Sequence, residues 1–374
     1  MAGIYIHIPF CSQKCHYCNF FSVASIKNKD KFLEALLHEI DLQTNYLNSE
    51  AIETIYFGGG TPSLLSAMEI NQIIDKLAKV HSIIQEPEIT LEANPDDLGK
   101  EKIAALNNTP INRLSIGVQS FFDQDLKYLN RVHTAEEALT SVKLASDSGF
   151  SNLSIDLIYG IPTLTEENWQ RNLKTFFSMN LPHLSAYALT VEPKTALDLL
   201  ISRNKMKPVE EEVVVSHFNR LMVAMKDQGY VHYEISNFCR EPHFSKHNLS
   251  YWSGKKYLGL GPSAHSFDGL SRQWNVPNIS EYIQATGNHK ISAEIENLSE
   301  NQLYNEYILT SLRTMWGTDL ALIESRFGQK FLTHFLMLIE KFLHNNKVVY
   351  KDGNYCLTDE GKLFADGIAS ELFI

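Results

Sequence analysis

Six short apolar runs alternate with longer amphipathic stretches over the first half of the chain. The apolar runs lie at 3–8, 54–57, 88–92, 113–117, 153–157 and 184–189. Between them, segments 30–47, 67–80, 134–148 and 165–178 carry apolar residues three and four positions apart, as amphipathic helices do. A series of strand and helix units predicts a parallel sheet covered by helices. Spacing alone does not distinguish an open sheet from a barrel.

Three of the five cysteines follow the first predicted strand within eight residues. Cys11, Cys15 and Cys18 have the spacing C-x3-C-x2-C. A loop this short can turn three thiolates toward one centre. Three thiolates suit a [4Fe-4S] cluster in which the fourth iron is left to an exchangeable ligand.

A zinc site and three free thiols are the alternatives for this loop. Zinc needs a fourth ligand, which His7 or His16 could supply, but structural zinc sites usually bring two separated ligand pairs and no second pair follows. Free cysteines are usually scattered and buried rather than clustered. A disulfide is disfavoured because no secretory segment is evident, so we expect a cytoplasmic, reducing location.

Polar or glycine-rich segments also end the other predicted strands. Gly58-Gly59-Gly60-Thr61-Pro62 follows the second strand, and Glu92, Gln119 and Asp156 stand at the ends of the next three. Taken singly, such residues are more often turn formers. Because the carboxyl ends of parallel strands form the ligand-binding edge of such sheets, we expect these groups around one mouth.

Taken together, these segments resemble the signatures of radical S-adenosylmethionine (SAM) enzymes. The segment Tyr5-Ile-His-Ile-Pro-Phe10 resembles the branch that contains the oxygen-independent coproporphyrinogen III dehydrogenase and the HemW-type heme chaperones. The resemblance implies an α/β fold, an incomplete (β/α)6 TIM-like barrel. It also implies that SAM chelates the open iron through its amino and carboxylate groups, and that reduction yields a 5'-deoxyadenosyl radical.

The same resemblance implies which residues contact SAM. The glycine run matches a motif that binds the methionyl amino group, and Glu92 matches a position near the ribose or amino group. Gln119, Arg131 and Asp156 match positions that bind a second SAM in the dehydrogenase branch. The full expected set is Tyr5, Gly59, Gly60, Thr61, Glu92, Gln119, Arg131 and Asp156.

The regular alternation stops near Thr190, and 209–228 predicts one long amphipathic helix. Further along, His247-Asn248-Leu249-Ser250-Tyr251-Trp252 resembles the HNxxYW motif of the heme chaperone branch, which implies heme contacts by His247, Tyr251 and Trp252. An imidazole can ligate heme iron, and the two aromatic rings offer flat apolar faces. Cys239 is a rival thiolate ligand, although a buried apolar role suits it better.

From about Ser299 the pattern becomes helical, at 299–314, 319–327 and 331–345, and then leads into a strand pair over 347–357 that turns at Asp352-Gly353. We therefore expect three parts: a radical SAM core over 1–200, a barrel extension over 201–298 and a helical, winged-helix-like domain over 299–374. Residues 301–374 hold seven Lys and Arg against nine Asp and Glu, and the net charge of the chain is −11. This balance argues against nucleic acid as a partner.

Three features favour the chaperone branch. The dehydrogenase branch carries a fourth cysteine where this chain has Asn19-Phe20. It also carries an N-terminal extension, whereas Tyr5 lies almost at the start of this sequence. The third feature is the HNxxYW motif, which marks the chaperone branch. We expect a cytoplasmic heme chaperone that binds a [4Fe-4S] cluster, SAM and heme, and delivers heme to acceptor hemoproteins. The alternative is the oxygen-independent coproporphyrinogen III dehydrogenase. Peripheral membrane contact and a homodimer are left open.

Overall fold

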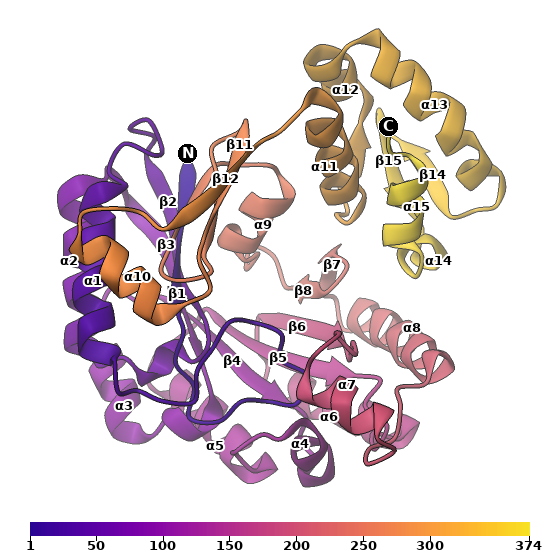
Figure 1. The fold of residues 1–374 in the computed structure, drawn as a ribbon. Coiled ribbons are helices and arrows are strands. Elements are labelled where there is room, and N and C mark those ends of the chain that lie inside the picture. Colours follow the sequence, from indigo (N-terminus) through magenta and orange to yellow (C-terminus); the bar gives the residue numbers. More distant parts are fainter.

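A curved sheet with helices on its outer face forms the larger body of the molecule, in a computed structural model that describes residues 1–374 (Figure 1). Its centre is a row of six parallel strands in chain order. These are β1 (Ala2–Ile8), β2 (Ile52–Gly59), β3 (Ile83–Ala93), β4 (Arg113–Gln119), β5 (Leu153–Tyr159) and β6 (His183–Ala188). The predicted series of six β-α units is therefore confirmed.

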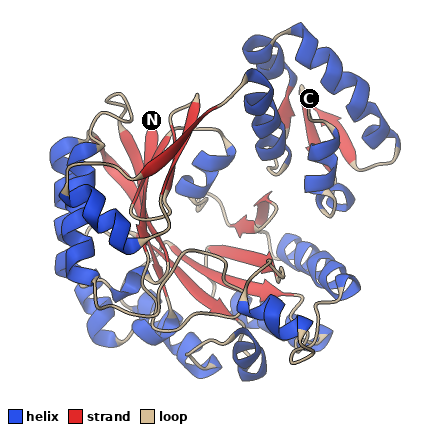
Figure 2. Cartoon of the chain, in the orientation of Figure 1, coloured by secondary structure: helices blue, strands red, loops and turns tan.

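Helices that follow these strands cover the outer face of the sheet (Figure 2). They are α1 (Lys29–Leu42), α2 (Ala67–Val80), α3 (Lys100–Leu106), α4 (Asp123–Leu129), α5 (Ala135–Asp147) and α6 (Glu166–Ser178), with the short 3-10 turns η1 (Pro62–Leu64) and η2 (Pro95–Asp97). Capping boxes at Ser66 and Thr134 fix the starts of α2 and α5 by satisfying their first backbone N–H groups. The helix predicted over 30–47 ends earlier, at Leu42.

Further strands lengthen the sheet at both edges. On the side of β1 lie β9 (Tyr257–Leu260), β10 (His265–Phe267), β11 (Ser271–Asn275) and β12 (Ala293–Asn297), and on the side of β6 lie β8 (Asn237–Cys239) and β7 (Val231–Glu234). The helices of this region are α7 (Ala196–Ser202), α8 (Glu211–Asp227), α9 (Lys246–Trp252) and α10 (Ile279–Gly287). Because β12 and β7 are the ends of the strand order, the barrel stays open.

The C-terminal body has its own core and its own three-stranded sheet, in the order β13-β15-β14. Its elements are α11 (Glu300–Leu312), β13 (Thr318–Asp319), α12 (Leu320–Phe327), α13 (Gln329–His344), β14 (Val348–Lys351), β15 (Asn354–Leu357), α14 (Asp359–Lys362) and α15 (Ala365–Glu371). The turn between β14 and β15 lies at Asp352-Gly353, where both residues have positive φ. Two backbone hydrogen bonds, Ile235 N to Arg313 O and Met315 N to Tyr233 O, join this body to the sheet.

None of the helices combines the length and the apolar composition that crossing a bilayer requires.

Candidate functional site

The cysteine loop is held from two sides. Cys11 donates its backbone N–H to Val23 O at 3.0 Å, which closes the loop on itself. On the other side, Gln13 Nε2 donates to Asn130 O at 3.0 Å, and Asn130 Nδ2 donates back to Lys14 O at 2.9 Å. Asn130 ends α4 in the left-handed conformation, which turns its backbone and side chain toward the loop. The loop is thus anchored to the end of α4.

The three cysteines share one environment. Cys11 is buried, whereas Cys15 and Cys18 are partly exposed. Burial raises the pKa of Cys18, and the charges of Cys15 and Cys11 raise it further. As the side chains stand, no group of three or more His, Cys, Asp or Glu residues is placed to hold a metal ion. A cluster would therefore require the thiols to turn toward one another, and the partial exposure of Cys15 and Cys18 leaves room for that. Three neighbouring sulfurs without a carboxylate among them fit an iron–sulfur cluster.

Of the two nearby histidines, only His16 keeps a ring nitrogen, Nε2, without a hydrogen-bond partner. His7 is buried and uses both ring nitrogens, Nδ1 with Tyr5 Oη at 3.2 Å and Nε2 with Phe21 O at 2.8 Å. His16 uses Nδ1 with Tyr128 O at 3.0 Å. The zinc alternative therefore gains nothing from His7.

The glycine run after β2 lies directly against the start of the cysteine loop. Gly60 N donates to Ile8 O at 2.8 Å and Thr61 N donates to Phe10 O at 2.7 Å. A Cβ at Gly60 would lie 2.6 Å from Phe10 O, and Gly59 has a φ of +105°. Side chains are excluded here by the close approach of two backbones. The glycine run is therefore fixed against the end of β1 and the start of the cysteine loop, and is not a flexible turn.

Two carboxylates face the inside of the barrel from β3 and β5. Glu92 accepts hydrogen bonds from Tyr56 Oη at 2.7 Å and from Gly59 N at 3.2 Å. Burial nevertheless raises the pKa of Glu92 to about 7, with a contribution from the charge of Asp156. Burial also raises the pKa of Asp156 to about 6, although Ser115 Oγ donates to it at 3.1 Å. Neither carboxylate forms a salt bridge, so both are suited to a cationic ligand.

Arg131 and Gln119 meet at the end of β4. The Arg131 guanidinium donates to Asn94 Oδ1 at 2.7 Å and to Gly117 O at 2.8 Å, and its Nη1 lies 3.4 Å from Cys15 Sγ. Gln119 has a positive φ of 68° and is buried. In this conformation Arg131 ties β3 and β4 to the cysteine loop through Nη1 and Nη2, and its Nε–H is left without a partner for the expected contact with a second SAM.

His247 does not lie on a surface that heme could reach. Its side chain is 0% exposed, Nδ1 is 2.8 Å from Thr54 Oγ1, and Nε2 is 2.9 Å from Tyr251 Oη. Both nitrogens that could ligate iron are therefore occupied within the protein. The structure gives no support to the expectation that His247 is an axial heme ligand.

The rest of the HNxxYW motif spans from this buried position to the surface. Tyr251 is partly exposed and contacts the His247 ring edge-on, with 5.0 Å between ring centroids. Trp252 is partly exposed, and the guanidinium of Arg313 lies 5.1 Å from its ring centroid. Cys239, the rival thiolate, is fully buried. Of the three residues expected to bind heme, Trp252 and Tyr251 are the accessible ones.

Comparison with known proteins places the chain in a family. A model of the Radical SAM superfamily matches residues 5–176, and a model of the HemN C-terminal domain matches residues 298–364. The heme chaperone HemW of Bacillus subtilis (strain 168) is 33% identical over 373 residues, which cover 98% of each chain. The chain belongs to the HemW family of radical SAM proteins.

Other relatives agree with this membership. HemW of Escherichia coli (strain K12) is 37% identical over 266 residues, 70% of this chain and 69% of that protein. The solved structure of coproporphyrinogen III oxidase (HemN) from Escherichia coli, described as a radical SAM enzyme, has a TM-score of 0.85 at 22% identity and covers 100% of this chain and 90% of its own. That likeness shows the fold. Membership of the radical SAM superfamily implies a [4Fe-4S] cluster and SAM as cofactors.

Residues to which the sequence analysis gave no part in SAM binding also line this HemW-family site. Tyr56 holds Glu92, Asn94 holds Arg131, and His7 holds the Tyr5 hydroxyl. A signal for two of them was present in the alternation of β1 and β2. Because every second residue of a strand faces the same side, the position of Tyr5 also implies that of His7, and Gly58 implies Tyr56.

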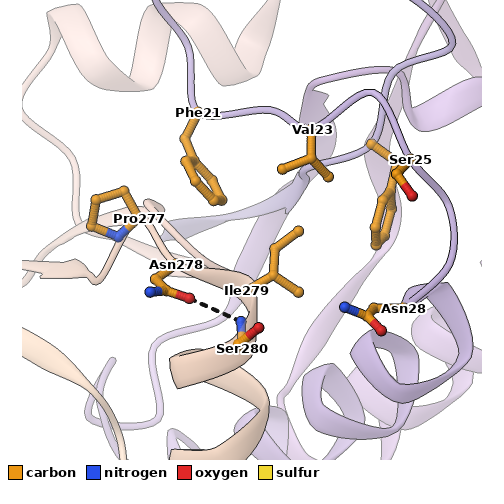
Figure 3. Close-up of a pocket in the computed structure, with 9 residues that line it drawn as sticks. Phe21, Val23, Ser25, Asn28, Pro277, Asn278, Ile279 and Ser280 are labelled. Atoms are coloured by element: carbon orange, nitrogen blue, oxygen red, sulfur yellow. Dashed lines mark hydrogen bonds between the residues drawn. The ribbon is translucent and has the colours of Figure 1, made fainter.

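A pocket of about 340 Å³ lies beside the segment that carries the cysteine loop. Figure 3 shows it between the segment that follows the cysteine loop, around Phe21 and Val23, and the start of α10, where Asn278 caps the helix by accepting from Ser280 N. No cysteine and no charged side chain lines it. It is therefore separate from the expected cluster and SAM positions.

Proposed function

We propose that this protein is a heme chaperone that carries a [4Fe-4S] cluster and SAM and transfers heme to acceptor hemoproteins. The observation that carries the proposal is the alignment with Bacillus subtilis HemW over 98% of both chains. The three-cysteine loop, with Asn19-Phe20 in place of a fourth cysteine, agrees with it.

Residues of the barrel mouth would hold the two cofactors. Cys11, Cys15 and Cys18 would bind three irons, and the backbone of Gly59 and Gly60 would lie along the methionyl end of SAM. When bound, the reduced cluster can supply an electron to the sulfonium of SAM.

The polar groups of the mouth suit the charge of SAM. Glu92 and Asp156 would place negative charge opposite its cationic groups, which releases the cost of keeping two carboxylates buried without a cation. Thr61 is buried, and its hydroxyl accepts from Asn94 Nδ2 at 3.2 Å, so it would fix the shape of the mouth.

We assign the heme contact to the surface formed by Phe244, Trp252, Arg313 and Trp316, called here the junction surface. It lies where α9 meets the segment that follows α11 in the C-terminal body. Trp316 is 44% exposed, and its ring centroid lies 6.1 Å from that of Phe244. Aromatic faces suit a porphyrin plane, and the Arg313 guanidinium beside Trp252, which pairs with Asp366 in this structure, suits a propionate that would take the place of that carboxylate. Tyr251 lies on the His247 side of α9, with its hydroxyl 2.9 Å from His247 Nε2, so Trp252 is the residue of the motif that contributes to this surface.

An anaerobic assay of the reconstituted protein tests the proposal. Hemin is titrated in and followed by its Soret band, and in a parallel sample coproporphyrinogen III is added with SAM and a reductant. We expect saturable hemin binding and no conversion of coproporphyrinogen III. Formation of protoporphyrinogen would overturn the proposal in favour of the dehydrogenase, the alternative that retention of Gln119, Arg131 and Asp156 favours.

A further inference from the structure

The inside of the barrel is built in layers between β1 and β2. The two strands are parallel, and their register places Gly3 beside Thr54, Tyr5 beside Tyr56 and His7 beside Gly58. These six positions alternate along their strands, so they share one face. Figure 1 shows α9 on the same inner side of the curved sheet.

His247, on α9, packs against the layer formed by Gly3 and Thr54. Its ring lies next to Gly3, where a Cβ would stand 2.8 Å from Thr54 Oγ1 and 3.3 Å from the imidazole. The backbone is fixed as well, because the N–H groups of Lys246 and His247 donate to the Glu88 carboxylate of β3 at 3.1 and 3.0 Å. The imidazole is therefore held by its backbone, by both ring nitrogens and by a glycine that makes room for it.

The ring of His247 supports the next layer. It stacks on Tyr56 with 4.9 Å between centroids and 23° between planes, and Tyr5 completes the stack at 6.1 Å from Tyr56. Tyr56 then donates its hydroxyl to Glu92 Oε1 at 2.7 Å. An unbroken series of contacts thus runs from the HNxxYW motif to the carboxylate expected to face SAM.

We propose that His247 is a positioning residue for SAM, which supports the Tyr56 ring from below so that the Tyr56 hydroxyl holds Glu92 toward the cofactor. This inference rests on the proposed binding of SAM and deepens it. It gives the histidine of the motif a role in the barrel that is separate from heme binding on the junction surface.

The charge state of the imidazole agrees with a supporting role. Burial lowers the pKa of His247 to about 3, so the ring is neutral at working pH. A neutral ring places no charge beside Tyr56. The Tyr56 hydroxyl therefore keeps its hydrogen bond to the Glu92 carboxylate without a competing charge. The titratable groups around Glu92 are Tyr5, Tyr56, Asp156, Tyr187 and Tyr251, and among them Tyr56 donates a hydrogen bond to Glu92.

A double-mutant cycle on SAM binding tests the proposal with the cluster-loaded protein. Tyr56→Phe removes the hydrogen bond to Glu92 and should weaken SAM binding about tenfold. His247→Ala should weaken it by a similar factor, because Tyr56 loses its support. If both act through one hydrogen bond, the double variant should bind SAM no more weakly than Tyr56→Phe alone.

His183→Ala is the matched control. His183 is also 0% exposed and also bonds through both nitrogens, to Ser154 Oγ and to Tyr233 Oη, each at 2.7 Å, but it contacts neither Tyr56 nor Glu92. Its removal should leave SAM affinity within about twofold. Should His247→Ala not fold, His247→Phe keeps a ring beneath Tyr56 and is expected to restore SAM affinity to within about threefold of the wild type, at some cost in stability.

Two further readouts separate positioning from general damage. The pH at which SAM affinity is half lost should rise in both variants, because Tyr56→Phe removes the donor that favours ionised Glu92 and His247→Ala takes away the support that holds this donor in place. It should not move in His183→Ala. Hemin affinity, measured on the same proteins, should stay within about twofold of the wild-type value.

A folded His247→Ala protein that keeps its SAM affinity and loses hemin binding would overturn the inference, as would effects on SAM affinity that multiply in the double variant. Failure of the wild type to transfer heme would instead count against the proposed function alone.

Discussion

Glu92 is the residue on which the fit between the barrel mouth and a cationic cofactor most depends. It is held by Tyr56 Oη and Gly59 N, yet burial keeps its pKa near 7. A positively charged ligand would favour the ionised form, so ligand binding and proton release are coupled at this side chain. The site is therefore expected to be pH-dependent just below neutrality.

Glu92→Gln tests this coupling. In the wild type, protonation of Glu92 should weaken SAM binding below pH 7, approaching about tenfold per pH unit well below the pKa. The amide variant should bind SAM more weakly than the wild type at pH 8. Between pH 6 and 7, its affinity should lack the part of the pH dependence that comes from protonation of Glu92. The amino group of SAM titrates in both proteins, so the difference between them isolates Glu92. Calorimetric titration across pH 6 to 8 measures it, and identical slopes would contradict the assignment.

Arg131 shows why side-chain partners at this site could not be predicted. In the sequence it lies twelve residues beyond Gln119, and the resemblance implied a ligand contact. In the folded chain its guanidinium instead reaches Asn94, Gly117 O and Cys15. These partners lie 14 to 116 positions away in sequence, and no local pattern encodes such contacts.

At the scale of elements, the strands of the barrel could be predicted because each is a short buried run between amphipathic helices. Strand β3 is the exception. It begins at Ile83 rather than Glu88, because backbone pairing with Ile52 extends it through the exposed residues Gln85 and Glu86. Strands β7 to β12 are three to five residues long and were not predicted individually, since runs of that length carry little periodicity.

The seven-residue helix α9 is the element whose place was least predictable. Its resemblance to the HNxxYW motif implied heme contacts, and only the tertiary fold brings His247 to Thr54, 193 positions away. Its docking depends on the space left by Gly3, a residue without any motif signal.

Gly3→Ala tests the docking of α9. The added Cβ would stand 2.8 Å from Thr54 Oγ1 and 3.3 Å from the His247 ring, so we expect a loss of about 1–3 kcal/mol in the free energy of unfolding, with weaker SAM binding. Gly99→Ala is the control, because a Cβ there meets nothing within 4 Å. Urea unfolding of both variants measures the difference. Equal stability of the two variants would show that α9 does not depend on this space.

At the scale of the whole molecule, the open barrel and the C-terminal body meet at the junction surface. Ile235 and Met315 form the backbone hydrogen bonds there, and Arg272 pairs with Glu306 at 2.7 Å. SAM and heme would thus occupy opposite ends of the HNxxYW motif, one inside the barrel and one at the junction.

Trp252→Leu tests this separation. Loss of the aromatic face should weaken hemin binding about tenfold, because buried tryptophans commonly carry much of a binding energy. SAM affinity should change by less than about twofold, since Trp252 does not touch the Tyr56 stack. Leu336→Ala, at an exposed position of α13, is the control for a surface change. Soret titration and calorimetry measure the two affinities, and a loss of SAM binding without loss of hemin binding would reverse the assignment.

The most direct measurement is heme transfer. Hemin-loaded, cluster-containing protein is mixed anaerobically with an apo-hemoprotein, the two are separated, and the Soret absorbance of each is read. We predict that heme moves to the acceptor faster from this protein than from serum albumin loaded with hemin at the same concentration. Heme that stays with this protein, or a preparation that converts coproporphyrinogen III and transfers no heme, would contradict the proposed function.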